Sequence, residues 1–163
     1  LKNMALFCCL QMAICSSTLA QTLTFTNTEN QLVEIKVLKS TDAPHSDKVH
    51  VYLLQVINTS NQAQLISLVA QNINCNNPSS IKDLALNHKV YTNNIDEFNA
   101  TDVVKILLPA NGEQNFHVKL MNESDVVNRY NCTVIKAIEI KNNKTISNEL
   151  QIESFIPDPA LFR

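Results

Sequence analysis

The stretch VVKILLPANGEQNFHVKL, Val103–Leu120, decides the fold class of this chain. Its apolar first run and its alternating second run flank the turn-forming group PANG at 109–112. Asn-Gly between two such runs is a strong short-range signal of a β-hairpin. In the second run Phe116, Val118 and Leu120 alternate with polar residues that include His117, so we expect the three apolar side chains to point into a core.

Short apolar runs bounded by Asn, Asp, Ser and Pro recur on both sides of this stretch, and no long segment has the 3.6-residue period of a helix. The expected strands cover 23–25, 33–37, 49–57, 65–73, 103–108, 116–120, 130–140 and 150–156. About eight strands at this spacing predict an all-β protein, an Ig-like antiparallel β-sandwich of about 7–8 strands. The stretch 76–102 is expected to be irregular.

Two of the expected strands allow a finer prediction. The run 49–57 is apolar on both faces, which indicates a central strand covered on each side, with 65–73 as its neighbour. In the run 130–140, the side chains of one parity are apolar apart from Lys136, which predicts that Cys132 points inward beside Tyr130 and Val134.

Three segments resemble the Ig-like and fibronectin-III-like modules of exported bacterial proteins: HVYLLQVINTS at 50–60, ILLPANGEQNFHVKL at 106–120 and YNCTVIKA at 130–137. The resemblance implies the sandwich fold rather than an activity. Departures from a true immunoglobulin domain are the absence of Trp and the place of Cys75, which follows the second central strand. The matching residues are Val56, Asn58, Leu108, Pro109, Gly112, Phe116, Val118, Tyr130, Val134 and Ala137.

The first twenty residues have the layout of a secretory signal peptide. Lys2 precedes the apolar run Met4–Ile14, and Thr18 and Ala20 are the small residues that a signal peptidase reads. The run is too short to span a bilayer, which needs about 20 apolar residues. We therefore expect cleavage after Ala20 and a single domain at 21–163, exported to the periplasm, the cell surface or the medium, without a transmembrane segment. A signal ending in Ala-Gln, with abundant Asn and Lys, also resembles proteins of Bacteroidetes-type bacteria.

Cysteine usage agrees with export. After cleavage only Cys75 and Cys132 remain, and two cysteines in an oxidising compartment most often form a disulfide. Two buried free thiols are the alternative interpretation. Cys15 raises a second alternative, a lipoprotein, although such signals want a small residue where this chain has Ile14.

Composition excludes some partners and predicts the turn chemistry. A net charge of −2 argues against a nucleic-acid partner, which usually requires a basic patch. Asn is abundant while the chain has one glycine, Gly112. Because Asn tolerates positive φ, we expect it to take over the turn positions of glycine. The base composition of the gene explains the Asn excess equally well.

No pattern in the sequence predicts catalytic, cofactor-binding or metal-binding residues. The nucleophile elbow, the Walker loop, the dinucleotide fingerprint and the zinc-protease helix are all absent. Two groups of potential metal ligands are read as ordinary polar loops, with a metal site as the alternative. The first group is Asp42, His45, Asp47 and His50, and the second is Asp96, Glu97, Asn99 and Asp102. His88 and His117 are expected to have no special role.

These observations favour a non-enzymatic exported module that binds a protein or glycan, or has a structural role, at the envelope or outside the cell. Recognition is expected in the loops at one end of the sandwich, within 76–102. Two alternatives remain open. One is a small exported proteinase inhibitor of Ig-like fold, and the other is a subunit or chaperone that works by strand addition at an exposed sheet edge.

Overall fold

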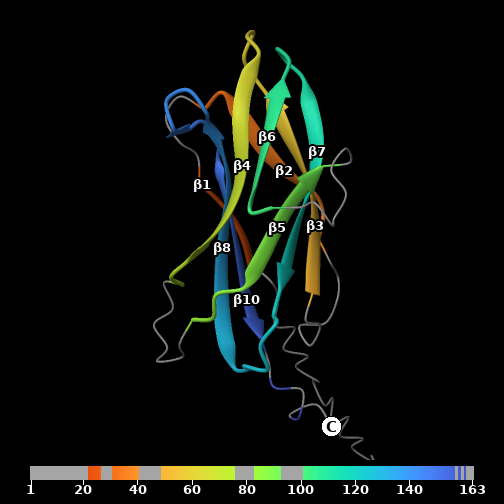
Figure 1. Ribbon diagram of the computed structural model, residues 1–163, viewed down its shortest axis with the longest axis vertical. Helices are drawn as coiled ribbons and strands as arrows, with labels where there is room; N and C mark the ends of the chain where they lie inside the picture. Colours follow the sequence, from red (N-terminus) through yellow and green to blue (C-terminus); the bar gives the residue numbers. More distant parts are fainter. Residues whose placement is uncertain are drawn as a thin grey trace, which may run out of the picture.

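The computed structural model describes residues 22–26, 31–40, 49–75, 83–92, 101–156, 158 and 160 (Figure 1). The expected signal peptide and the segments 41–48, 76–82 and 93–100 lie outside the described residues. The described strands form two antiparallel sheets, so the prediction of an all-β sandwich is confirmed. Their long axes run along the length of the molecule in Figure 1.

The larger sheet has six strands, in the order β1-β10-β8-β4-β6, with β9 beside β8. Their bounds are β1 (Thr22–Thr26), β4 (Gln64–Ile73), β6 (Val103–Leu108), β8 (Arg129–Glu139), β9 (Lys144–Thr145) and β10 (Glu149–Ile156). The smaller sheet has four strands, in the order β2-β3-β7-β5. Their bounds are β2 (Val33–Lys39), β3 (Val49–Asn58), β5 (Asn87–Thr92) and β7 (Glu113–Met121). The sequence pattern missed β5 and the two-residue β9.

The core lies between the two sheets, and β3, β7 and β10 bury every second residue against it. In β7, Phe116, Val118 and Leu120 are buried as predicted. β3 is an interior strand, but only one of its faces is in the core, because its alternate residues from Val49 to Ile57 are half-buried or exposed. The largest fully buried side chains are Tyr52, Phe116, Ile35, Leu54, Ile66, Leu68, Leu108, Leu120, Ile135, Leu150, Ile152 and Val33.

The turn at 109–112 connects the two sheets and does not form the predicted hairpin. The N–H of Gly112 donates a 3.0 Å hydrogen bond to the carbonyl oxygen of Pro109, so the turn itself is tight. However, β6 pairs with β4, whereas β7 pairs with β3 and β5. A type I′ hairpin turn needs positive φ at both central residues, and here only Asn111 has it, at 54°.

The connection from β3 to β4 also crosses between the sheets, so the prediction that 65–73 lies beside 49–57 is wrong. β4 pairs with β8 and β6 in the larger sheet. The prediction about Asn is confirmed, because the described non-glycine residues with positive φ are Asn111, Asn128 and Asn143. Each of them lies in a connection between strands, where a side chain that tolerates this conformation is needed.

The core face of β8 is the opposite of the predicted one. Ile135 and Ala137 belong to the core cluster, and the residues of the same parity towards the start of the strand are Asn131 and Thr133, both fully buried. Cys132 therefore lies on the outer face of the larger sheet. The sequence pattern was misleading because both faces of β8 carry apolar residues. The buried side chains of Asn131 and Thr133 are also of types that usually face solvent.

Candidate functional site

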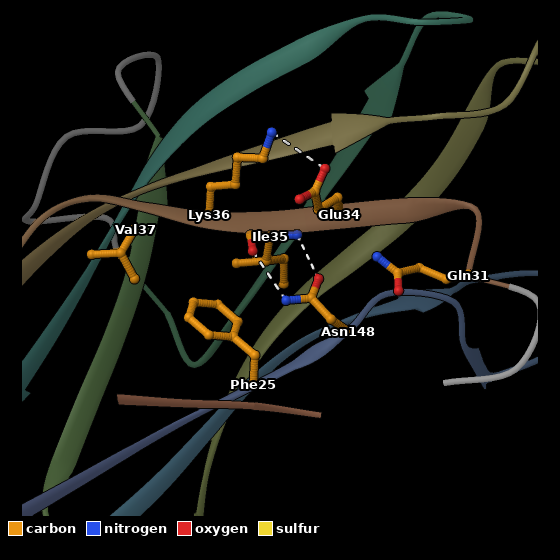
Figure 2. Close-up of a pocket in the computed structure, with 7 residues that line it drawn as sticks. All are labelled: Phe25, Gln31, Glu34, Ile35, Lys36, Val37 and Asn148. Atoms are coloured by element: carbon orange, nitrogen blue, oxygen red, sulfur yellow. Dashed lines mark hydrogen bonds and ion pairs between the residues drawn. The ribbon is translucent and has the colours of Figure 1, made fainter. Parts of the chain in front are cut away.

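A groove of about 460 Å³ lies where β1, at one edge of the larger sheet, faces β2, at one edge of the smaller sheet (Figure 2). A hollow of this size suits a small ligand or a side chain of a partner. Its walls come from strands that belong to different sheets, so the sandwich fold itself creates it. The lining residues are Phe25, Gln31, Glu34, Ile35, Lys36, Val37 and Asn148.

Asn148 closes one part of the groove by acting as a substitute for a neighbouring strand. Its Oδ1 accepts a 2.7 Å hydrogen bond from the N–H of Ile35, and its Nδ2 donates a 3.0 Å hydrogen bond to the carbonyl oxygen of Ile35. The N–H of Val33 donates a 3.0 Å hydrogen bond to the carbonyl oxygen of Ile146. The backbone groups of β2 that point away from β3 are thus satisfied as far as Ile35.

Val37 is the next residue of β2 whose backbone faces the groove. Residues directed away from a neighbouring strand alternate along the chain, so Val37 has the same orientation as Ile35. The register of β2 against β3 shifts between Val37 and Lys39, which ends the regular ladder. Beyond Ile35, no strand of the described chain pairs with this side of β2.

The groove combines an apolar floor with a polar rim. Figure 2 shows the ring of Phe25 and the side chain of Val37 on one side of β2, and Glu34 and Lys36 on the other. Phe25 is 48% exposed, although a core-facing strand position usually buries such a ring. Lys36 Nζ lies 3.3 Å from Glu34 Oε2. Apolar walls with few polar groups are typical of binding sites.

The two groups of potential metal ligands, expected to be ordinary polar loops, lie mostly outside the described residues. Asp42, His45, Asp47, Asp96, Glu97 and Asn99 lie outside the described residues, His50 is buried and Asp102 is exposed. In the part of the chain that the structure describes, no three His, Cys, Asp or Glu side chains gather to hold a metal ion.

The two other histidines lie apart from the groove. The ring of His117 stacks on Tyr91, with centroids 4.9 Å apart and planes 9° from parallel, so His117 is half-buried rather than simply solvent-facing. His88 lines a hollow of about 320 Å³ at the start of β5, together with Lys89, Asp102 and Glu123.

The predicted disulfide joins Cys75, just after β4, to Cys132 in β8, with a Cα–Cα distance of 5.3 Å. Cys132 is 1% exposed although it lies on the outer face, not beside the core as predicted. The N–H of Cys75 also donates a 2.7 Å hydrogen bond to Asp83 Oδ2. Asp83 forms a parallel bridge with Tyr130. Both ends of the segment 76–82 are therefore fixed to the start of β8.

A buried hydrogen-bond network holds the chain that follows Asp83. Asn131 Nδ2 donates to Asn72 Oδ1 at 3.0 Å and to the carbonyl oxygen of Leu84 at 2.9 Å. Thr133 Oγ1 donates to Asn131 Oδ1 at 3.1 Å. Asn72 in turn binds the backbone of Leu86 through both its Nδ2 and its Oδ1. The network explains why polar side chains occupy the core face of β8.

No family model and no curated protein matches this chain. Among solved structures, the chain is similar to the FixG-related protein from Vibrio parahaemolyticus, with a TM-score of 0.42 and 16% sequence identity. The match covers 85% of this chain and 96% of that chain. None of the described residues belongs to a helix long and apolar enough to cross a membrane.

Proposed function

We propose that this chain is a non-enzymatic, exported module of the Ig-like type that binds a protein partner through the groove between β1 and β2. The half-exposed ring of Phe25 is the observation that carries the proposal. It leaves apolar surface open beside Val37, whose backbone can hydrogen-bond a ligand. An apolar side chain of a partner would cover the ring while the partner's main chain bonds to Val37.

A photo-crosslinking amino acid placed at position 25 tests this proposal in the exported protein. The matched control carries the same amino acid at Val126, which is also a partly exposed apolar residue but lies outside the groove. We expect one discrete cross-linked protein product from position 25 and none from position 126. Equal products from both positions would contradict a role for the groove. If the ligand is instead a glycan, the wild-type protein should bind to a glycan array, and Phe25→Ala should abolish that binding.

Export has a separate test. We propose that the mature chain begins at Gln21, because Thr18 and Ala20 have the small side chains that a signal peptidase selects. Mass spectrometry of the native protein would show this N-terminus. A species that begins at Cys15 and carries acyl chains would instead identify the protein as a lipoprotein.

A proteinase inhibitor is the second candidate, and it would act through another part of the molecule. The disulfide and the Asp83 hydrogen bond fix both ends of the segment 76–82, as the base of a loop presented to an active site would require. Inhibition of a panel of proteinases by the wild-type chain, abolished by Cys75→Ala with Cys132→Ala, would favour this candidate over the groove.

A further inference from the structure

The two sheets have edge strands that differ in how they are covered. β2 has Asn148 along its open side and a register shift after Val37. β5 is crossed by the chain at Thr101, whose carbonyl oxygen accepts a 2.7 Å hydrogen bond from the N–H of Val90. β1 borders the groove. β6, at the opposite edge of the larger sheet from β1, has a regular register and no strand on its outer side among the described residues.

The pairing of β4 shows which backbone groups of β6 point outward. The N–H of Ile140 donates a 3.2 Å hydrogen bond to the carbonyl oxygen of Leu65, so the backbone of Leu65 faces β8. In an antiparallel ladder this direction alternates, and Ile66 therefore faces β6. Its opposite residue in β6, Ile106, bonds to β4. The N–H and C=O groups of Lys105 and Leu107 then point away from the sheet.

The outward-facing side chains at this edge are also exposed to solvent. Leu107 is 66% exposed, and the residue opposite it in β4, Leu65, is 51% exposed. These two residues form an apolar patch on the outer face of the larger sheet. Lys105, two residues before Leu107 on the same face, is exposed and makes no ion pair with a described residue. Edge strands with these properties are sites of strand addition.

We propose that β6 binds an extended segment of a protein partner as an additional antiparallel strand. The segment has a carboxylate opposite Lys105 and an apolar side chain opposite Leu107. Its main chain exchanges hydrogen bonds with the N–H and C=O groups of both residues. Lys105 selects the acidic residue because an opposite-charge pair directly across two strands is favourable, whereas a like-charge pair is unfavourable.

Charge also argues against a second copy of this chain as the partner. Two β6 strands that paired around a two-fold axis through Lys105 would place Val103 opposite Leu107, and the two Lys105 side chains directly opposite each other. Repulsion between these ammonium groups disfavours that register. A shift by two residues in one direction brings Pro109 into the ladder, where it has no N–H to donate. A shift in the other direction pairs Lys105 with Val103, whose carbonyl oxygen already accepts a 2.6 Å hydrogen bond from Thr101 Oγ1.

Hydrogen exchange of the free protein tests the orientation of the edge. We expect the amides of Lys105 and Leu107 to exchange rapidly and the amide of Ile106 to be protected. Of these three amides, only that of Ile106 points toward β4. The probe for binding is the capped peptide Thr-Leu-Thr-Glu-Thr-Val-Thr, which places Leu opposite Leu107 and Glu opposite Lys105. Added peptide should slow exchange at Lys105 and Leu107.

Variant peptides separate strand addition from nonspecific association. N-methylation of the Glu removes a donor that faces β6 and should weaken binding about threefold to tenfold. N-methylation of the next Thr, whose N–H points away, is the matched control and should leave the affinity unchanged. Replacement of the Glu by Lys should weaken binding about fivefold, and the variant Lys105→Glu should reverse that preference.

Three results would overturn the proposal. One is the absence of peptide binding to protein whose circular dichroism shows an intact fold. Another is equal loss of affinity from both N-methylated peptides. The third is a concentration-dependent dimer in solution that the neutral variant Lys105→Gln strengthens, since this would identify a second copy as the partner. Phe25 lies at the other edge of the larger sheet, so Phe25→Ala should not change peptide affinity.

Discussion

Asn58 Nδ2 donates a 2.8 Å hydrogen bond to the carbonyl oxygen of Pro109, which joins the turn after β3 to the turn after β6. The N–H of Asn58 also donates to the carbonyl oxygen of Gly112 at 2.8 Å, and the N–H of Asn111 donates to Ser60 at 3.1 Å. A Cβ at position 112 would lie 3.0 Å from Cδ of Pro109, so glycine fits this contact. The two connections between the sheets therefore hold each other in place.

Asn58→Ala should destabilise the fold by about 2–4 kcal/mol, because the carbonyl groups of Gln62, Leu108 and Pro109 lose their donor. Asn58 is buried, and its Oδ1 additionally accepts from the N–H of Ser60 at 3.0 Å. Urea unfolding measures the loss. Asn61→Ala is the control, since Asn61 is exposed in the same turn. Equal effects of the two substitutions would mean that the hydrogen bonds of Asn58 contribute nothing.

Phe116→Ala should cost about 3–5 kcal/mol, because it removes a fully buried ring from the core. His117→Ala, the neighbouring change, removes a half-buried ring that stacks on Tyr91 and should cost about 1 kcal/mol. Denaturant unfolding of both variants gives the difference. Similar losses would indicate that the outer face of β7 is packed as tightly as its core face.

Asn131→Ala should destabilise the protein by about 2–4 kcal/mol, since Asn72, Leu84 and Thr133 each lose a hydrogen-bond partner in a buried site. Hydrogen exchange should also become faster at the amide of Leu86, which donates to Asn72 Oδ1. Asn74→Ala, at an exposed position, is the control. Unchanged exchange at Leu86 would show that the network does not hold this segment.

Reduction of the Cys75–Cys132 disulfide should lower stability by about 4 kcal/mol, as expected for a sequence separation of 57 residues. The melting temperature should fall by roughly 10 °C. Calorimetry with and without reductant gives this shift, and the circular dichroism of the strands at low temperature should not change. Ready labelling of both thiols in the native, non-reduced protein would contradict the pairing.

The sequence predicted strands and their buried faces where alternation was strong, but not the partners of those strands. The alternation of apolar and polar residues in β2 and β7 shows which side chains face the core. The same alternation would occur whichever sheet the strand belonged to. The turn residues at 109–112 are compatible with a hairpin and with a crossing between sheets. β5 was missed because Val90 is the one apolar residue on its core face, between His88 and Thr92.

The groove could not be predicted from the sequence for a related reason. Phe25 and Asn148 are far apart in the chain and meet at the groove because β1 pairs with β10 and β2 lies opposite. Asn148 precedes a strand and resembles an ordinary turn residue, yet its amide bonds to the backbone of Ile35. The position of β6 at an edge likewise depends on the sheet order and not on any local pattern.

The neighbouring positions of β1 and β10 determine which parts of the chain meet at one end of the molecule. Thr22 lies opposite Glu153, so the start of β1 and the end of β10 lie side by side, at the lower end of the sandwich in Figure 1. Leu107 lies near the opposite end, beside the turn at 109–112. A β-strand rises about 3.3 Å per residue. The end of β6 beside this turn and the paired ends of β1 and β10 therefore lie at opposite ends of the sandwich, separated by the length of its strands.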